Sequence, residues 1–389
     1  MKGSALSVIL IAIFASVGLA QSGRRITATP TPVVKTEAPD SYSETKPNPQ
    51  RPPRVISSMR STTNDASVPK NDSTQAAGTP VEDAETAIKV DTNLITIPVS
   101  VFDRNGLYIP NIQQNEFKIY EDGVEQEIAY FGTSDKPFSV VLLLDVSYST
   151  HYHIDEIRDS AKAFVDQLKP QDRVMVIEFS ESVRVRTEFT SDRNQIYKAI
   201  DKADFGSGTS LYEAVDLTLR KQLAKVEGRK AVVLFTDGVD TTSRKATYDS
   251  TLGYAEESDA LIFGIYYNTY TENRGGTGTV WPSSSWPFPS IGGGGTARGN
   301  SASDYALGRK YVEELSEYTG GRVFRPEATP GGLTRAFEGI AEELRRQYSI
   351  GYVPKDDGKP GQRKQIKVRV SRANLLVRSR DSYIVGSSK

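Results

Sequence analysis

The sequence predicts an α/β fold: a doubly wound, mostly parallel six-stranded sheet with helices on both faces and a Rossmann-like order of elements. Two observations predict it. Apolar runs without alternation, which mark strands buried on both faces, recur along the middle of the chain. Stretches with apolar residues at helical spacing separate these runs, and such alternation is typical of a parallel sheet. The regions on either side contain short strands, so we expect the α/β domain to be inserted in a small β module formed by both flanks.

Composition excludes several classes of function. The chain has 389 residues and a formal net charge of -1, and this near-neutral balance gives no indication of a nucleic-acid partner. It contains no cysteine, so neither disulfides nor a thiolate site can operate. Histidine occurs only at His151 and His153, which leaves little material for a histidine-based metal site or a catalytic triad.

The start of the chain resembles a targeting segment followed by a linker. Residues 1–20 read as a secretory signal peptide, with Lys2 before a short apolar run and a predicted cut at Gln21. We therefore expect a secreted or periplasmic protein, attached to a membrane only if that segment stays uncleaved. Residues 21–86 are rich in Pro, Ser, Thr and charge, and they carry too few large apolar residues to form a core, which predicts a disordered linker.

The two flanks of the α/β domain supply the predicted β module. Its N-terminal part spans 87–134, where Pro98 favours a sheet edge and Asp122-Gly123 indicates a hairpin turn. Its C-terminal part spans 347–387, and seven Lys and Arg residues lie between its residues 363 and 380. Because these basic residues alternate with apolar ones, we favour the solvated side of a strand over a nucleic-acid face. The prediction of one module requires strands of the two flanks to pair.

The α/β domain is predicted at 137–346. The link between its second and third strands is so short that it permits only a hairpin, so the third strand should be an antiparallel edge. An insertion at 269–303, rich in Gly, Ser, Trp and Pro, is interpreted as a flexible surface loop; the alternative is that its aromatic side chains contribute to partner binding. The six predicted strands cover residues 140–144, 173–179, 183–189, 231–235, 261–266 and 322–324.

Oxygen-bearing side chains follow the first of these strands. Asp145, Ser147 and Ser149 come directly after a buried strand and before a helix, at the carboxyl end of the sheet, where open α/β sheets bind their ligands. A carboxylate and two hydroxyls are hard donors that suit Mg²⁺, Ca²⁺ or Mn²⁺. Taken alone, the pattern is equally compatible with a strand end whose serine caps the next helix.

Two later segments have a similar character. The Gly-rich loop around Thr209 lacks the lysine and the spacing of a phosphate-binding loop, so we interpret it as presenting the Thr209 hydroxyl. Asp237 follows another buried strand, within Phe-Thr-Asp-Gly. Asp240 lies three residues further on and is interpreted as solvated rather than as a support for the site.

Together these three segments resemble the von Willebrand factor type A (VWFA) domain and its metal-ion-dependent adhesion site. The resemblance covers about residues 137–346. The flanking segments 116–123 and 347–352 also look like those of the secreted VWFA-related proteins common in Acidobacteria. One departure is Tyr148, which stands where a small glycine is frequent; its bulky side chain is expected to narrow access or to pack against a ligand. His151 and His153 follow, and we interpret them as exposed loop residues rather than metal ligands.

The resemblance implies a set of metal ligands and a function. The metal would be Mg²⁺, with Mn²⁺ or Ca²⁺ as alternatives, and a protein ligand presenting an Asp or Glu carboxylate would complete its coordination. We expect metal-dependent protein binding or adhesion and no enzymatic activity, no cofactor other than the metal and no nucleic-acid partner. The alternatives are a structural cell-envelope component with a vestigial metal site and a metal-dependent hydrolase, for which no general base or nucleophile is evident. The implied metal ligands are Asp145, Ser147, Ser149, Thr209 and Asp237.

Overall fold

The computed structural model describes residues 42–46, 94–133, 136–148, 154–267, 301–327, 329 and 331–386. The predicted signal peptide, most of the predicted linker and nearly all of the 269–303 insertion lie outside these residues. Among the helices that the structure describes, none combines the length and the apolar character needed to cross a bilayer.

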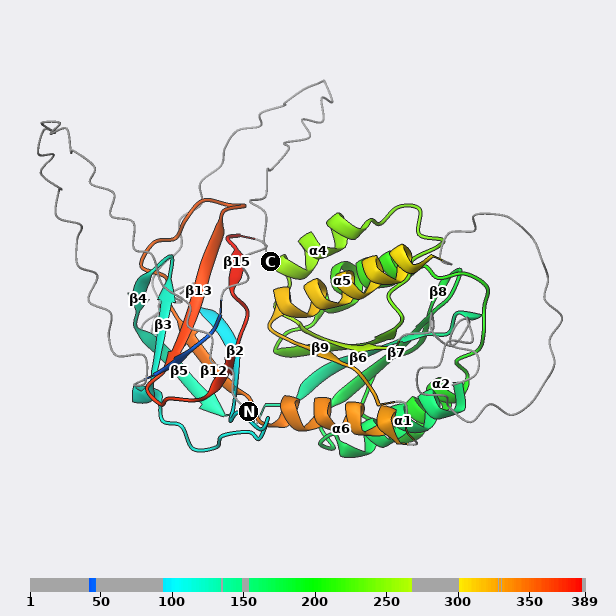
Figure 1. The fold of residues 1–389 in the computed structure, drawn as a ribbon, viewed down its shortest axis with the longest axis horizontal. Coiled ribbons are helices and arrows are strands. Elements are labelled where there is room, and N and C mark those ends of the chain that lie inside the picture. The colour runs from blue at the N-terminus through cyan, green and yellow to red at the C-terminus, as the bar shows by residue number, and fades with distance from the viewer. Residues whose placement is uncertain are drawn as a thin grey trace, which may run out of the picture. The chain divides into compact units, whose positions relative to one another are not determined.

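The α/β domain contains the predicted six-stranded sheet (Figure 1). Its strand order is β11-β10-β9-β6-β7-β8, and all neighbours are parallel except β7 and β8, which form the predicted antiparallel edge. The predicted fold class is therefore confirmed. The strands are β6 (Phe138–Asp145), β7 (Arg173–Phe179), β8 (Val183–Thr190), β9 (Arg229–Thr236), β10 (Leu261–Tyr266) and β11 (Val323–Phe324).

Helices cover both faces of this sheet (Figure 1). The alternate residues of its central strand β6 are apolar and point to opposite faces, so each face needs helices to bury it. Leu142 of β6 packs in one core with Phe164 and Phe337, whereas Leu143 packs in a second core with Leu211 and Tyr311. The first core takes α1, α2 and α6, and the second takes α3, α4 and α5. The helices are α1 (Ile154–Gln167), α2 (Arg193–Asp201), α3 (Leu211–Asp216), α4 (Tyr248–Glu257), α5 (Ala302–Thr319) and α6 (Gly332–Arg345).

Two helical segments have features that the apolar pattern does not indicate. The helical run that begins at Leu211 changes its winding, from α3 into a π-helix at Leu217–Gln222 and a 3-10 turn at Leu223–Lys225. Helix α4 was not predicted at all, because its sequence carries few strongly apolar residues. Its start is marked by Thr247 and Ser250, which form a reciprocal capping box.

The flanks form one β module, as predicted. Strand β12 from the C-terminal flank lies between β2 and β5 from the N-terminal flank, and β13 pairs with β3. A shared core, which includes Ile97, Ile119, Tyr348 and Val368, packs between the sheets. The short 3-10 turn Gln114–Glu116 precedes β3. The strands are β1 (Ser43–Glu44), β2 (Ile95–Phe102), β3 (Phe117–Glu121), β4 (Val124–Gln126), β5 (Ile128–Thr133), β12 (Tyr348–Tyr352), β13 (Arg363–Val370), β14 (Leu376–Arg378) and β15 (Ser382–Ile384).

Local details of the module confirm one prediction and correct two. Asp122 and Gly123 both have positive φ at the β3–β4 turn, as the hairpin prediction requires. Strand β2 is not an edge strand, because β14 and β12 flank it; Pro98 is tolerated because β14 pairs only with Ser100–Phe102. The prediction of a disordered linker is wrong for residues 42–46, because β1 pairs with β13 there. Side-chain contacts stabilise this short strand in addition to its backbone hydrogen bonds.

The α/β domain leaves and re-enters the module at one place. Thr133, the last residue of β5, is the register partner of Tyr348, the first residue of β12. The domain spans the sequence between these two residues. Its connections to the module are short, because β6 begins at Phe138 and α6 ends at Arg345. Both connections therefore meet the six-stranded sheet at the end where β6 begins, opposite the end where Asp145 lies.

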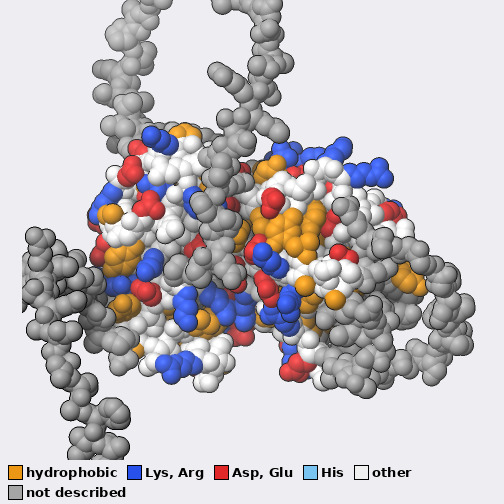
Figure 2. Space-filling view, turned by 45° about the horizontal axis from the view of Figure 1, so that its top comes forward, with side chains coloured by type: hydrophobic (Ala, Val, Ile, Leu, Met, Phe, Trp, Pro, Cys, Tyr) orange, Lys and Arg blue, Asp and Glu red, His pale blue; other side chains and the backbone are white. Residues whose placement is uncertain are grey.

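The basic residues of the C-terminal flank are engaged within the protein. Glu343, which is 2% exposed, pairs with Arg322 at 2.7 Å and with Arg378 at 3.9 Å. Glu256 pairs with Arg363 at 2.9 Å, which joins α4 to β13. Basic and acidic side chains are also interspersed over the face in Figure 2. These basic residues are thus structural partners of acids rather than simply the solvated side of a strand.

Candidate metal site

Asp145 ends the central strand of the six-stranded sheet and is completely buried. Its Oδ2 accepts a hydrogen bond from Thr236 Oγ1 at 2.7 Å, and its Oδ1 accepts one from the Ser147 amide at 3.0 Å. Thr236 is the last residue of the neighbouring strand β9. The parallel pairing of β6 with β9 thus places the end of one strand where it can orient the carboxylate of the other.

The loop after Asp145 is joined to the Gly-rich loop. Ser147, which is 2% exposed, forms an isolated parallel bridge with Gly206, and the Gly206 amide donates to the Val146 carbonyl at 3.1 Å. A Cβ at position 206 would lie 2.2 Å from Ser180 Oγ, so the Gly-rich loop approaches the residues that follow β7 this closely only because residue 206 is glycine.

Thr209 is held between the Gly-rich loop and the loop that follows Asp237. The Thr209 amide donates to Thr241 Oγ1 at 2.8 Å, and the Thr209 carbonyl accepts from the amides of Thr241 and Thr242. The Thr209 side chain is 5% exposed. These backbone contacts fix the position of the residue while leaving its hydroxyl for another role. Sequence reasoning missed Thr241, although the polar run from residue 240 to 243 marks the loop as unusual.

Asp237 follows β9 and is 1% exposed. Its Oδ1 accepts a hydrogen bond from the Val239 amide at 3.1 Å. Gly238 has a φ of +80°, and a Cβ there would lie 2.4 Å from the carbonyl oxygen of Gly308 in α5. The turn that carries Asp237 therefore needs glycine both for its backbone conformation and for its close approach to the helix.

The two buried aspartates act on each other electrostatically. Burial, and after it the nearby charge of Asp237, raise the pKa of Asp145 to about 7, against hydrogen bonds from Ser147 and Thr236 that lower it. Asp237 also contributes to raising the pKa of Tyr266, where burial is the main cause. A buried acid whose proton affinity is raised by a second acid beside it forms a site in which a cation is favoured.

Among the predicted ligand residues, Asp145 contacts Ser147 and interacts electrostatically with Asp237, while Thr209 contacts Thr241 in the loop that follows Asp237. Ser149, His151 and His153 lie outside the described residues. Tyr148 is 65% exposed beside the site. Asp240, which we interpreted as solvated, is instead half-buried and accepts a hydrogen bond from the Tyr212 amide at 3.2 Å, so it caps the start of α3.

The donor set fits a hard divalent cation. It consists of carboxylate and hydroxyl oxygens, which Mg²⁺ accepts together with water. Within the described residues, no group of three or more His, Cys, Asp or Glu side chains is arranged to hold a metal ion. Two of these carboxylates are present here, so the remaining protein ligands would be hydroxyls, as the sequence pattern implies.

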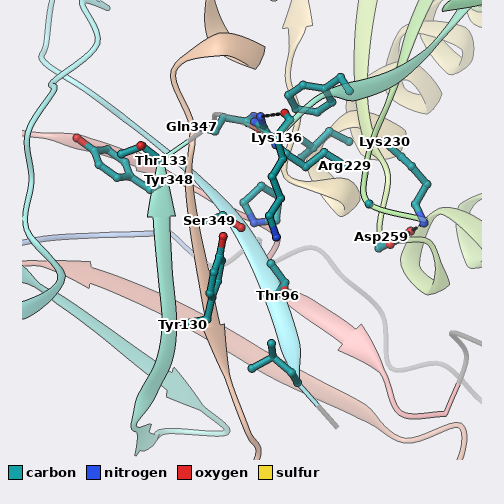
Figure 3. A pocket seen from close by; sticks show the side chains of 15 residues that line it. Thr96, Tyr130, Thr133, Lys136, Arg229, Lys230, Asp259, Gln347, Tyr348 and Ser349 are labelled. Carbon is teal, nitrogen blue, oxygen red and sulfur yellow. Dashed lines mark hydrogen bonds and ion pairs between the residues drawn. The ribbon is translucent and has the colours of Figure 1, made fainter. Parts of the chain in front are cut away.

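A separate cavity of about 330 Å³ lies between the β module and the amino end of the six-stranded sheet (Figure 3). Its basic groups have partners within the protein. Arg229 donates to Gln347 Oε1 at 3.2 Å and stacks 3.7 Å from the Phe138 ring centroid, while Lys230 pairs with Asp259 at 2.8 Å. The contact of Arg229 with Gln347 ties the domain to the module, whereas the other two lie within the domain. None of the four predicted ligand residues that the structure describes lines the cavity.

Comparisons with known proteins place the fold. Residues 140–239 match the family model of the von Willebrand factor type A domain. No curated protein matches the chain. One similar solved structure is a von Willebrand factor type A protein from Catenulispora acidiphila, with 13% identity over 72% of this chain and 74% of that one and a TM-score of 0.41.

Two further structures have comparable scores. The vWF domain of the type V pili tip protein Mfa5 from Porphyromonas gingivalis is 12% identical over 54% of this chain and 95% of that one, with a TM-score of 0.39. Proximal thread matrix protein 1 from the mussel byssus, with a zinc-occupied MIDAS motif, is 13% identical over 58% of this chain and 49% of that one, with a TM-score of 0.38.

Proposed function

We propose that this chain, which carries a von Willebrand factor type A domain, is a secreted protein that uses a metal site in that domain to bind a protein ligand. Asp145, Ser147, Ser149, Thr209 and Asp237 would hold the metal, for which Mg²⁺ is our first choice. When bound, the metal supplies a directional, charge-assisted contact for an Asp or Glu carboxylate of the protein ligand.

The observation that carries this proposal is the pair of buried aspartates at adjacent strand ends. Burial and the charge of Asp237 raise the pKa of Asp145, so holding both carboxylates ionised costs free energy that a cation would recover. The surrounding contacts favour binding over catalysis. Thr236 and Thr241 hold a carboxylate and a loop backbone in place, and neither residue is a general base.

The first test measures metal binding by the full chain. Thermal unfolding is followed with Mg²⁺ and with EDTA, and Mg²⁺ at about 100 times its Kd should add roughly 2.7 kcal/mol to the free energy of unfolding. For a chain of this size, that is a rise in Tm of roughly 5–11 °C. Asp145→Asn should abolish the rise. Asp259→Asn, which changes a carboxylate at the opposite end of the sheet, should retain it.

The second test concerns the ligand. A random peptide library is bound to the chain in Mg²⁺ and eluted with EDTA, and the eluted peptides should be enriched in Asp and Glu. The same selection on Asp145→Asn should show no such enrichment. A Mg²⁺ response equal in the parent and Asp145→Asn would refute the metal site, whereas metal binding without acidic peptides would refute only the proposed ligand chemistry.

A further inference from the structure

Residues 42–46 supply an outer strand of the β module's five-stranded sheet (Figure 1, blue). Strand β1 pairs antiparallel with β13, with Ser43 opposite Val370 and Glu44 opposite Arg369. The ladder continues one residue further, because the Thr45 amide donates to the Val368 carbonyl at 2.9 Å. Residues 42–46 thus add a strand to the β13 edge of a sheet whose other strands all come from residues after 116.

The two hydroxyl residues of this segment are set into the module. Ser43 and Thr45 are 7% and 5% exposed. Ser43 Oγ donates to the Arg372 carbonyl at 2.7 Å and accepts from the Leu375 amide at 2.9 Å. Thr45 Oγ1 accepts from the Val368 amide at 3.1 Å. Residues at alternate positions are therefore recognised through polar contacts, beyond the backbone ladder.

The residues between and before the two hydroxyls make charged and aromatic contacts. Glu44 pairs with Lys367 at 3.4 Å and with Arg369 at 3.3 Å. The Arg369 guanidinium also lies 3.8 Å from the centroid of the Tyr42 ring. The edge of β13 thus selects a segment that has an aromatic residue, then a hydroxyl, an acid and a second hydroxyl.

Two other described strands pair with β13, and neither occupies the edge that β1 takes. Strand β3 pairs with residues 366–370 in the sheet order β1-β13-β3-β4, and β15 pairs only with residues 363–365, whereas β1 meets Val368, Arg369 and Val370. Departure of β1 would uncover backbone groups that act as a template for another strand. The ladder is short, so its opening requires the loss of few contacts.

The connection to the rest of the chain is long. Residues 47–93, 47 in number, separate β1 from the next described residue, Leu94. A connection of this length can span up to about 160 Å, which exceeds the size of a domain. The contacts of β1 are the same whether the segment comes from its own copy or from another, so the local concentration of copies decides which one supplies it.

We propose that the β13 edge is a strand-acceptor site for the Tyr42–Lys46 segment of a second copy of this chain. Two copies exchange their segments reciprocally and form a closed dimer when their local concentration is high. This assembly does not use the metal site, so its test is independent of the metal-dependent function.

The absence of cysteine from the chain makes a crosslinking test direct. Glu44→Cys and Arg369→Cys place two cysteines at register partners. In the full-length double variant at low concentration, a disulfide should form within one copy, which reports that the segment docks. In a mixture of the two single variants, a disulfide-linked dimer should form with a yield that rises with concentration. Glu125→Cys, on β4 of the same sheet, replaces Arg369→Cys as the control and should give at least tenfold less dimer.

Charge reversal gives a second test without crosslinking. Glu44→Arg mismatches its own β13, and the double variant Lys367→Glu with Arg369→Glu mismatches its own Glu44. The changed segment of the first variant matches the changed β13 of the second, and the unchanged segment of the second matches the unchanged β13 of the first. Mixing the two variants should therefore give a heterodimer in light scattering that neither variant forms alone. The proposal is wrong if the double-cysteine variant forms no internal disulfide, or if the mixtures give no more dimer than their controls while both variants remain folded.

Discussion

Two sets of buried acids in this protein have opposite surroundings. Where the β module meets the α/β domain, Glu343 lies against the arginines Arg322 and Arg378, and Glu256 lies against Arg363. At the carboxyl end of the sheet, Asp145 lies near a second acid, Asp237, which raises its pKa. Burial raises the pKa of Glu343 and its two arginines lower it, whereas burial and the neighbouring acid both raise the pKa of Asp145. Proton uptake or, as we propose, metal binding offsets this second effect. Equal burial therefore does not imply an equal role.

The largest expected effect is a pH dependence from Asp145 in metal-free protein. Its pKa is raised from 3.8 to about 7 by burial and by Asp237, so the folded state keeps a proton that the unfolded chain releases. The contribution to stability is complete below pH 4 and is lost as pH rises towards 7, by roughly 4 kcal/mol for the full shift. Asp145→Asn should remove this slope and be the more stable protein at pH 8.

Urea unfolding in EDTA between pH 4 and 8 measures this effect. Asp259→Asn should keep the parent's slope, because Asp259 is half exposed and pairs with Lys230. A lower stability of Asp145→Asn than of the parent at pH 8 would mean that the Asp145 carboxylate stabilises the fold, as we expect for Glu343 and Glu256. The proposed difference between the two sets of acids would then be wrong.

The next effect has the opposite sign. Glu343→Gln removes the acid but leaves the two guanidiniums in place, and breaking a buried ion pair of this kind costs about 3 kcal/mol. We expect Tm to fall by roughly 6–12 °C. In calorimetry, replacing both partners of the closer pair, Glu343→Leu with Arg322→Met, should recover part of the loss. A Tm within 1 °C of the parent would show that this pair does not hold the junction.

A smaller effect is expected where the site is supported by neutral hydrogen bonds. Thr241→Ala removes the acceptor for the Thr209 amide, which should lower stability by about 1 kcal/mol. It should also weaken Mg²⁺ binding several-fold in a calorimetric titration, because the Thr209 loop is less well fixed. Thr241→Ser keeps the hydroxyl and should restore both values; restoration of stability alone would separate folding from metal binding.

The smallest effect concerns an ion pair at the surface. Glu342 near the end of α6 pairs with Arg346, the residue that follows the helix, at 3.1 Å, and both side chains are 51% exposed. Glu342→Gln should change stability by less than about 0.5 kcal/mol in urea unfolding, because solvent and salt screen exposed pairs. Its neighbour Glu343 is the contrast, since the two acids differ in burial and not in chemistry.

Burial along a strand and contacts between distant residues leave different traces in the sequence, which explains what the sequence could predict. Continuous apolar runs revealed β6, β7, β9 and β10, because a strand buried on both faces has few polar positions to confuse the pattern. Asp145 and Asp237 stood out because each ends such a run. Residues that act through neighbours in space gave weaker signals: Thr241 orients the loop of Thr209 across 32 positions of sequence, and no local pattern reports that contact.

Two failures have the same physical origin. The 42–46 segment is too polar to predict as ordered, yet Ser43 and Thr45 find hydrogen-bond partners more than 300 residues away. The basic run of the C-terminal flank alternates like a solvated strand, but its partners are acids elsewhere in the fold, such as Glu256 and Glu343. Polar pairing over long sequence separations leaves no periodicity to detect.

The register pair Thr133–Tyr348, where the α/β domain leaves and re-enters the β module, has a mechanical consequence. If a ligand binds at Asp145 as we propose, a force on that ligand that is opposed at the start of β6 acts along the strand. Strand β6 is flanked by parallel ladders to β7 and β9, so many hydrogen bonds share this load in shear rather than opening one after another. The domain is thus attached in the direction in which its central strand resists extension most strongly.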